Sequence, residues 1–351
     1  MYHVVGGGPV GLWVAGKLGR EAVLHEEHAE IGRPEHCTGL VSNRLETIVR
    51  VPEELKLNRV AGAKFFSRNG SFTLTRGRTE ANVIDRAGFD KYLSELAESA
   101  GAEILKGRNA NPFRFPRNRT VFVAEGVSSR TTRALGGKME TLPAVQYVIR
   151  TRERLDSGFV ELHFLRSEFF AWVVPESGHL AKVGVAAGEK PKELLDLFLK
   201  RRFFGSGFRT ICRQGSHVVV GGPVKKTVHG NLVLVGDCAG QVKATTGGGI
   251  VTGLICAGIA AENAGNPLKY ECEWRRKVGG ELEAARLVRK VLSRLSAEEY
   301  DGLIGFAKRN SSALRRSGDM DFHSKTLLEI FSKPLNWGFL LKYLGKLFLH
   351  G

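Results

Sequence analysis

The sequence has little cysteine, and no two cysteines stand at a spacing typical of a metal or redox site. Five cysteines occur in 351 residues, at positions 37, 212, 238, 256 and 272, and no C-x-x-C pair is present. This odd number and this spacing indicate neither a disulfide framework nor a zinc site. We therefore expect free thiols in a reducing compartment and no bound metal ion.

Long apolar runs are also absent. No segment reaches the roughly 18 uncharged apolar residues that a membrane-spanning helix requires. The chain begins with MYHVVGGG, without a charged leader and a following apolar stretch. The sequence therefore predicts neither a spanning helix nor a signal peptide, and we expect a cytoplasmic protein.

Acidic residues are fewer than basic ones. The chain has 36 Asp and Glu against 52 Lys and Arg, a formal net charge of +16. Such a charge favours anionic partners: nucleic acid, acidic lipid headgroups or an acidic protein. The basic residues are dispersed, however, without an aromatic-interleaved basic stripe or a nucleic-acid-binding module. We expect no nucleic-acid partner and keep a nucleic-acid-binding flavoprotein as an alternative of another class.

A glycine motif follows the first apolar run. HVVGGGPVGLWVAGKLG, from residue 3, contains Gly6-x-Gly8-x-x-Gly11 between a predicted strand and a predicted helix. Glu26 ends the next apolar run, twenty positions after Gly6. This context predicts a dinucleotide site in which the glycines allow close approach, the helix amides hold a pyrophosphate and the acid binds ribose hydroxyls. Glu27 is the alternative for the ribose.

A second glycine-rich stretch, GDCAGQVKATTGGGI, occupies residues 236–250 directly after the apolar run NLVLV. A dissociable NAD does not require a second glycine-rich strand-to-helix junction, whereas a permanently held FAD needs another contact for its ribityl chain and ring. Asp237 can accept a hydrogen bond from a ribityl hydroxyl, while the glycine backbone lies against the isoalloxazine. The expected FAD contacts in this stretch are Gly236, Asp237, Gly247, Gly248, Gly249 and Ile250.

Four stretches of the chain resemble the geranylgeranyl reductase family of FAD-dependent oxidoreductases, most of all its archaeal members, within the p-hydroxybenzoate hydroxylase-like flavoproteins. These stretches are GGGPVG (6–11), EIGRPEHCTGLVS (30–42), FFAWVVP (169–175) and GDCAGQVKATTGGGIVTGLICAGIAAE (236–262). The first and last are shared across the superfamily, and the other two are typical of the isoprenoid-reducing branch. The resemblance implies an FAD-dependent reductase that saturates geranylgeranyl double bonds, on precursors of archaeal-type ether lipids.

The resemblance also implies roles for particular residues. Cys37 is expected near the flavin face, where a thiol can steer the substrate or pass a proton. His36 is a second candidate for a proton relay, since the unperturbed pKa of histidine lies near neutrality. Arg86 resembles an arginine that lies near the cofactor in these proteins.

The strand FFAWVVP supplies the expected substrate contacts, Phe170, Trp172 and Pro175. Phe170 and Trp172 lie on one face of the strand because its side chains alternate. They are expected to line an apolar channel over the flavin.

The pattern of strands and helices predicts an α/β flavoprotein of two interleaved domains. We expect a Rossmann-type FAD-binding domain from residues 1–52, 80–137 and 223–290. Residues 53–79 and 138–222 are expected to form an antiparallel-sheet substrate domain, with a hairpin at 63–76 around Asn69 and Gly70. Residues 291–351 are expected to be a helical tail.

The tail ends with KPLNWGFLLKYLGKLFLHG, in which Lys342 and Lys346 accompany aromatic and apolar residues from Trp337 to Phe348. Such a helix can lie in a membrane surface, which fits a lipid substrate, or pack on the protein's own core or on a partner subunit. No second dinucleotide motif is present to hold a nicotinamide. An acidic electron donor such as a ferredoxin is therefore expected to dock transiently on the basic surface.

Two other flavoprotein functions stay open from the sequence. The first is an FAD-dependent monooxygenase or halogenase on the same fold. The second is a non-catalytic lipid carrier that keeps FAD as a structural element.

Overall fold

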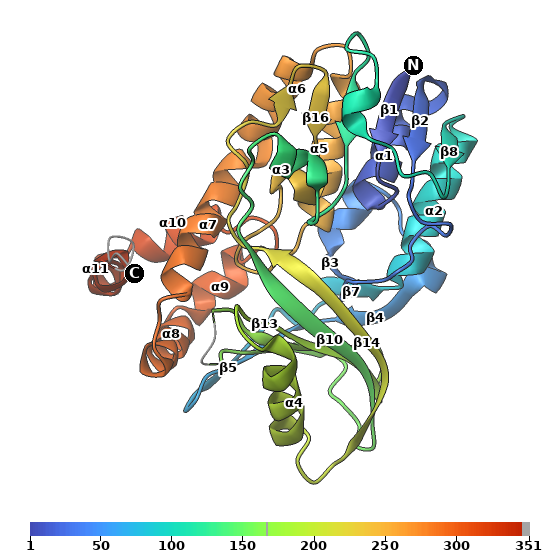
Figure 1. Ribbon diagram of the computed structural model, residues 1–351. Coiled ribbons are helices and arrows are strands. Elements are labelled where there is room, and N and C mark those ends of the chain that lie inside the picture. Colours follow the sequence, from blue (N-terminus) through green and yellow to red (C-terminus); the bar gives the residue numbers. More distant parts are fainter. Residues whose placement is uncertain (166–167, 346–351) are drawn as a thin grey trace.

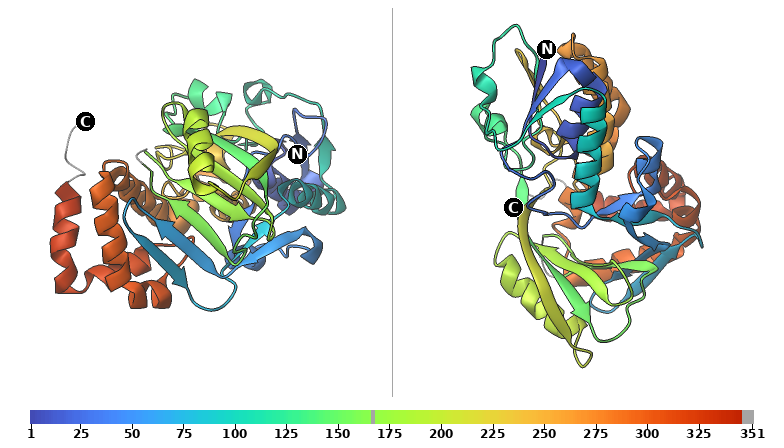
Figure 2. Two further views of the ribbon diagram at one scale, coloured as in Figure 1. Left: turned by 90° about the horizontal axis from the view of Figure 1, so that it is seen from below. Right: turned by 90° about the vertical axis from the view of Figure 1, so that its right-hand side faces the viewer.

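A computed structural model describes residues 1–165 and 168–345. The described chain forms an α/β lobe that contains the N-terminus, a sheet lobe beneath it and a group of C-terminal helices at the side (Figures 1 and 2). The long strands β10 (Thr141–Thr151) and β14 (Phe208–Val219) pair antiparallel and run through the sheet lobe, and the start of β10 and the end of β14 lie beneath the α/β lobe. The observed mixture of sheets and helices confirms the predicted fold class.

The α/β lobe is built on a six-stranded sheet of order β15-β16-β9-β1-β2-β8. All its strands are parallel to their neighbours except β15, which pairs antiparallel to β16. The strands are β1 (Tyr2–Val5), β2 (Ala22–His25), β8 (Glu103–Leu105), β9 (Val121–Val123), β15 (Val228–His229) and β16 (Leu232–Leu234). A parallel sheet places the carboxyl ends of its strands along one edge, where ligands bind in such folds.

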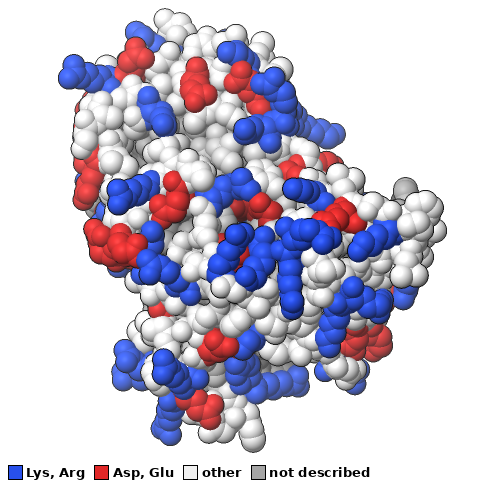
Figure 3. Space-filling model, turned by 180° about the vertical axis from the view of Figure 1, so that it is seen from behind, with Lys and Arg blue, Asp and Glu red and all other residues white. Residues whose placement is uncertain are grey.

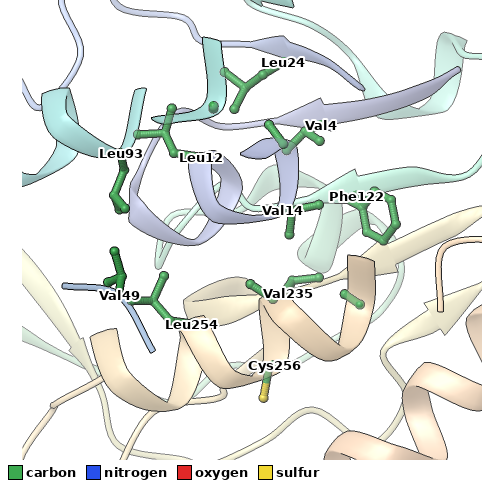
Figure 4. Close-up of a cluster of buried hydrophobic side chains, with 14 of the residues drawn as sticks. Val4, Leu12, Val14, Leu24, Val49, Leu93, Phe122, Val235, Leu254 and Cys256 are labelled. Atoms are coloured by element: carbon green, nitrogen blue, oxygen red, sulfur yellow. The ribbon is translucent and has the colours of Figure 1, made fainter. Parts of the chain in front are cut away.

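Three helices pack against this sheet and form the largest core. They are α1 (Pro9–Leu18), α2 (Arg86–Ser99) and α5 (Ile250–Glu262). Figure 4 shows Leu12 and Val14 of α1 between the strand residues Val4 and Leu24 and the α5 residue Leu254. The core therefore holds α1 and α5, which follow the two glycine-rich stretches, against one sheet.

The sheet lobe contains seven strands in the order β14-β10-β13-β12-β11-β5-β6. The remaining strands are β5 (Gly62–Phe66), β6 (Ser71–Thr75), β11 (Phe159–His163), β12 (Ala171–Pro175) and β13 (Leu180–Ala186). Strands β5 and β6 form the predicted hairpin. The expectation of a purely antiparallel sheet is wrong at one place: β11 pairs parallel to β5, because the chain returns to the hairpin from a distant segment instead of through a tight turn.

One face of the seven-stranded sheet packs on α4 (Pro191–Arg202). Residues of β12 alternate between the two faces, so Ala171 and Val173 contact the α4 side while Trp172, with Phe170 just before the strand, belongs to a cluster on the other side. This second face is the one turned toward the α/β lobe, since Val218 in the same cluster lies against Gly247 of the second glycine-rich stretch.

A small antiparallel sheet of order β3-β7-β4 lies next to the two lobes. Its strands are β3 (Leu40–Ser42), β4 (Lys56–Val60) and β7 (Ala81–Ile84). The boundary expected at residue 52 falls between β3 and β4, which share this sheet. The division of the chain into domains therefore stays a prediction.

Helices occupy most of the chain after residue 249. A short α3 (Arg130–Ala134) follows β9, and the later helices are α6 (Pro267–Trp274), α7 (Gly280–Leu292), α8 (Ala297–Arg309), α9 (Ser311–Ser317), α10 (Ser324–Phe331) and α11 (Trp337–Leu344). Helix α8 begins with a capping box between Ser296 and Glu299. Within residues 1–165 and 168–345, none of the helices combines the length and the apolar content needed to cross a bilayer. Lys346, Leu347 and Phe348 of the predicted amphipathic tail lie outside the described residues.

An ion pair joins the sheet to α4 and makes stability depend on pH. The Glu161 carboxylate accepts from Arg202 Nε at 2.7 Å and contacts His163 Nε2 at 2.8 Å. Burial alone raises the pKa of Glu161, but hydrogen bonds from Arg202 and His163 outweigh burial and lower this pKa from 4.5 to about 2. A lowered native pKa stabilises the fold above the unfolded-state pKa, and this stabilisation is lost as the pH falls through the native value.

We expect Glu161→Gln to lower the free energy of unfolding by roughly 1–3 kcal/mol at neutral pH. Urea unfolding of the wild type and the variant at a series of pH values measures the difference. The difference should narrow as the pH falls from 4.5 toward 2, where the native carboxylate gains its proton. A difference independent of pH over that interval would contradict this account.

Candidate functional site

The first glycine motif lies between β1 and α1, and each of its glycines has its own geometric reason. Gly6 has a φ of +110°, and a Cβ there would overlap the carbonyl group of Ala124. A Cβ on Gly11 would overlap the Gly6 carbonyl oxygen. A Cβ on Gly8 would meet no protein atom within 4 Å, so the space before the α1 N-terminus is open. An open N-terminus with free amides suits a pyrophosphate.

The acid after β2 is Glu26, whose carboxylate accepts hydrogen bonds from the backbone of the turn. Gly7 N donates to Glu26 Oε2 at 2.6 Å, and His28 N donates to Glu26 Oε1 at 2.7 Å. Glu26 is 8% exposed. The alternative, Glu27, is exposed and accepts from the Asn109 side chain at 3.2 Å. The geometry thus places Glu26, rather than Glu27, beside the motif.

Gly7 is a functional candidate that the spacing argument missed. A Cβ at this position would lie 2.8 Å from Glu26 Oε2, so a side chain here would push the acid away. The signal in the sequence was the second glycine of GGGPVG, in the variable position of the motif.

The second glycine-rich stretch begins with a tight turn, and its N-terminal part contacts α1. Gly236 has a φ of +79°, and a Cβ there would lie 3.0 Å from Val10 of α1. Gly236 N donates to Gln241 Oε1 at 2.8 Å, and Gln241 Nε2 pairs with the Tyr270 hydroxyl at 2.8 Å. Gln241 is fully buried. It therefore fixes the turn that carries Asp237, a role that the sequence pattern did not reveal.

Asp237 lies at this turn with a carboxylate that makes no hydrogen bond within the described chain. A Cβ on Gly249 would approach Asp237 Oδ1 to 2.7 Å, so Gly249 leaves room for the carboxylate. Burial raises the pKa of Asp237, and the positive charge of Arg86 opposes this rise. A carboxyl group of this kind is free to bind a ligand hydroxyl.

Arg86 joins Asp237 to the Cys37 segment. It begins α2, and its Nη2 donates to Asp90 Oδ1 at 2.8 Å and to Oδ2 at 3.0 Å. Burial works against the charge of Arg86, but Asp90 and the Cys37 side chain more than offset it and raise the pKa of Arg86. Its Nε is buried without a hydrogen-bond partner. Cys37, Arg86 and Asp237, which are far apart in the sequence, thus form one cluster, which we call the thiol cluster.

Two buried polar residues of the seven-stranded sheet hold the Cys37 segment. Lys182 on β13 is 3% exposed; its Nζ donates to the Cys37 carbonyl at 3.2 Å and forms ion pairs with Glu35 and Glu176. Gln146 Nε2 lies 3.5 Å from the same carbonyl oxygen. Neither residue was singled out from the sequence, because each stands inside an ordinary strand pattern.

The sheet places two of the three predicted substrate residues near this segment. Trp172 Nε1 donates to Gln146 Oε1 at 2.9 Å, and the indole lies over Gly184, where a Cβ would overlap the ring. Phe170 contacts Trp172 edge to face, with centroids 6.3 Å apart. Pro175 is not brought to them: it ends β12 on the opposite sheet face, and its carbonyl accepts from Asn58.

His36 lies apart from the thiol cluster. Its side chain is exposed and lines a surface pocket of about 610 Å³ between the segment 28–36 and β14. Arg33 and Arg213 line the same pocket. The structure therefore separates His36 from Cys37, although the two residues are adjacent in the sequence.

The predicted glycines before α5 form the far end of the second stretch. Gly247 has a φ of +71°, and a Cβ there would lie 2.5 Å from Val218 of β14. Gly248 pairs with Lys243 in an isolated bridge, and Ile250 begins α5. Lys243 is buried and donates to Asp321 Oδ1 at 2.8 Å. The loop is thus packed between the sheet lobe and the C-terminal helices.

These features fit a bound dinucleotide. The open helix N-terminus, the acid beside it and the Asp237 carboxylate follow β1, β2 and β16, whose carboxyl ends lie along one edge of the parallel sheet. The orphaned Arg86 Nε belongs to the guanidinium whose charge acts on Asp237. Among residues 1–165 and 168–345, no three histidine, cysteine, aspartate or glutamate side chains are placed to hold a metal ion.

Known proteins resemble this chain in sequence. No protein-family model matches the chain. The chain is 30% identical to digeranylgeranylglycerophospholipid reductase 2 of Methanothermobacter thermautotrophicus, with 86% of this chain and 90% of that protein aligned. It is 27% identical to digeranylgeranylglycerophospholipid reductase of Methanocaldococcus jannaschii, with 86% and 88% aligned.

Two solved structures share the fold at lower identity. A geranylgeranyl bacteriochlorophyll reductase-like protein from Thermoplasma acidophilum has a TM-score of 0.81 at 21% identity, covering 99% of this chain and 98% of that one. A flavin-dependent brominase has a TM-score of 0.74 at 14% identity, covering 97% and 99%. At these identities the likeness shows the fold alone.

The chain therefore has the fold of the flavin-dependent oxidoreductases. By its 30% identity over most of a relative's length, it belongs to the digeranylgeranylglycerophospholipid reductase family. The predicted fold class and family are confirmed.

Substitutions at Gly8 and Gly11, the last two glycines of the first motif, distinguish an effect on cofactor binding from an effect on folding. We expect both Gly8→Ala and Gly11→Ala to reduce the flavin that copurifies, because both side chains narrow the turn. Only Gly11→Ala should also lower the melting temperature of the flavin-free protein, since only its Cβ meets protein atoms. The ratio of visible to ultraviolet absorbance and thermal unfolding measure the two effects. A Gly8→Ala protein with full flavin would contradict the predicted site.

Proposed function

We propose that this protein is an FAD-dependent reductase that saturates geranylgeranyl double bonds of an archaeal-type ether glycerophospholipid precursor. The observation that supports this most strongly is the thiol cluster, which links the Cys37 segment to the second glycine-rich stretch in a chain of this reductase family. Saturation of a double bond requires a hydride for one carbon and a proton for the other. A site for this reaction also has to exclude water.

We assign FAD to the two glycine-rich turns. Glu26 would bind the adenosine ribose, the α1 N-terminus the pyrophosphate, and Asp237 the ribityl chain. The turn at 247–249 would lie against the ring. When bound and reduced, FAD supplies the hydride.

The chain's own residues would orient the substrate and manage the proton. The Cys37 thiol, beside the charge of Arg86 and in a segment whose carbonyl contacts Lys182 and Gln146, would pass a proton to the second carbon. Phe170 and Trp172 cover the inner sheet face beside it and supply the apolar surface on which an isoprenoid chain would lie.

The electron donor is proposed to be a small acidic protein such as a ferredoxin. Figure 3 shows Lys and Arg side chains gathered across the middle of one face of the molecule. Together with a net charge of +16, this surface favours transient contact with an acidic partner. An anaerobic single turnover in which reduced ferredoxin, instead of dithionite, reduces the flavin tests this donor.

The central experiment is an anaerobic single turnover. The purified protein is reduced with dithionite and then mixed with a digeranylgeranylglycerophospholipid, while the flavin spectrum and the lipid mass are recorded. We expect flavin reoxidation and a gain of two mass units for each double bond. A flavin that stays reduced until air enters would instead favour the monooxygenase, halogenase or carrier functions.

Three variants, at two positions, test the assignment of roles within that assay. Asp237→Ala should weaken flavin retention, because it removes the acceptor for the ribityl chain. Cys37→Ala and Cys37→Ser should keep their flavin and change the reduction rate or the number of double bonds saturated. A Cys37→Ala protein that matched the wild type on each lipid tested would remove Cys37 from the mechanism.

The C-terminal helices present an apolar surface that we propose contacts the membrane. Four side chains in α10, in α11 and between them are strongly exposed: Leu328 (73%), Leu335 (94%), Trp337 (54%) and Leu341 (69%). We call them the C-terminal apolar surface. Lys333 and Lys342 lie beside it, and basic residues near an apolar helix face favour anionic lipid.

Leu335→Glu/Leu341→Glu should reduce co-sedimentation with vesicles of anionic phospholipid at least about fivefold, since it places charge in the apolar contact. Phe204→Glu is the matched control, because Phe204 is 90% exposed after α4, away from this surface. Equal retention of the double variant and the wild type on these vesicles would overturn the membrane contact.

A further inference from the structure

A cationic side chain lies buried without an acidic partner at the junction of α7 and the sheet lobe. Arg289, in the last turn of α7, is 5% exposed. Its Nη2 is buried and has no hydrogen-bond partner. Within the described chain, no carboxylate lies within 4.0 Å of this guanidinium, the limit for an ion pair. A buried charge of this kind is costly unless a ligand or a protein group compensates it.

The neighbours of Arg289 compensate its charge only weakly. The guanidinium lies over the Phe169 ring, 4.5 Å from the centroid. Burial lowers the pKa of Arg289, and the more distant Tyr300, Glu168 and Glu140 oppose this effect. Glu168 is already engaged, since it accepts from Gly188 N at 3.1 Å. The guanidinium, which stays protonated in proteins, therefore keeps donors that no described group uses.

A continuous series of aromatic contacts connects Arg289 with the thiol cluster. Phe169 stacks on Phe170 at 4.2 Å between centroids, and Phe170 contacts Trp172 at 6.3 Å. Trp172 donates to Gln146, which lies 3.5 Å from the Cys37 carbonyl oxygen. Arg289 thus lies at one end of an apolar sheet face and Cys37 at the other.

The same sheet face meets the second glycine-rich stretch. Phe169 and Phe170 belong to one buried cluster with Val220, and Val218 packs against that cluster. Val218 is the residue closest to the position of a Cβ on Gly247. An apolar chain on this face would therefore lie between a cation at one end and the expected flavin ring at its side.

We propose that Arg289 binds the phosphate of the substrate's headgroup, so that the isoprenoid chains extend from it along Phe169, Phe170 and Trp172 toward Cys37. This assignment rests on the proposed reductase function. A guanidinium recognises phosphate with two parallel hydrogen bonds, and such contacts are strong where water is excluded. The ligand class is a phosphomonoester or phosphodiester that carries an apolar tail.

The test compares a phosphorylated lipid with its uncharged counterpart on three variants. Arg289→Met removes the charge. Arg289→Lys keeps the charge but lacks the planar guanidinium that forms two parallel hydrogen bonds. Arg286→Met is the matched control. Arg286 lies on the same helix, but it is paired with Glu283 on the surface. Each flavin-loaded variant is assayed in steady state with a digeranylgeranylglycerophospholipid and with digeranylgeranylglycerol.

We expect Arg289→Met to raise KM for the phospholipid at least about tenfold and to leave KM for the uncharged lipid unchanged. Arg289→Lys should recover part of the loss, and Arg286→Met should match the wild type. The melting temperature should not fall in Arg289→Met, because replacing an unpaired buried charge by an apolar side chain is neutral or stabilising. An equal loss on both lipids, or no loss on either, would overturn the proposal.

Inorganic phosphate distinguishes a headgroup site from a site for the free anion. In the wild type, phosphate should compete with the phospholipid, leave turnover of the uncharged lipid unchanged, and raise the melting temperature less in Arg289→Met. Phosphate that alters turnover of the uncharged lipid through Arg289, or that stabilises both proteins equally, would contradict the assignment. If neither lipid reoxidises the reduced wild type, the reductase function itself fails, which is a different outcome from lipids that react without headgroup preference.

Discussion

The buried charge of Arg86 is the constraint on which the arrangement of the site depends. A guanidinium removed from water needs anionic or dipolar neighbours, and Arg86 obtains them from separate segments: Asp90 on its own helix, Cys37 from the segment before β3, and Asp237 from the turn after β16. Because an unpaired buried charge costs several kcal/mol, these segments have to converge when the chain folds. The charge of Arg86 thus favours an arrangement in which the Cys37 thiol and the turn that carries Asp237 lie beside the same guanidinium.

The convergence is reinforced from the opposite side by the sheet lobe. Lys182 and Gln146 both approach the Cys37 carbonyl from β13 and β10, so the segment is held between the α/β lobe and the seven-stranded sheet. Lys182 is itself buried and needs Glu35 and Glu176 as counter-charges. The polar groups around the Cys37 carbonyl therefore satisfy one another, and Trp172 Nε1, which donates to Gln146, adds no unpaired donor to the aromatic face beside them.

The sequence predicted those parts of the site in which the local backbone conformation restricts the residue type. The turn at Gly6, Gly8 and Gly11 and the acid at residue 26 follow from close approach of backbone, which only a few residue types allow, so spacing was sufficient. Lys182, Gln146, Gln241 and Arg289 were missed because their roles arise from partners many residues away, and nothing in a strand or helix pattern marks them. Pro175 and His36 lie apart from Trp172 and Cys37, because strand alternation and a surface turn separate residues that are near in sequence, and their roles stay predictions.

The C-terminal helices are attached to both the α/β lobe and the sheet lobe. Asp301 of α8 accepts from Ser67 and Asn69 of the β5–β6 hairpin, and Asp321, before α10, pairs with Lys243 of the second glycine-rich stretch. These contacts fix the helices that carry the C-terminal apolar surface relative to the sheet face and to Arg289 on α7. The phosphate site proposed at Arg289 and the membrane contact proposed for the C-terminal apolar surface therefore belong to helices that pack on the same two lobes.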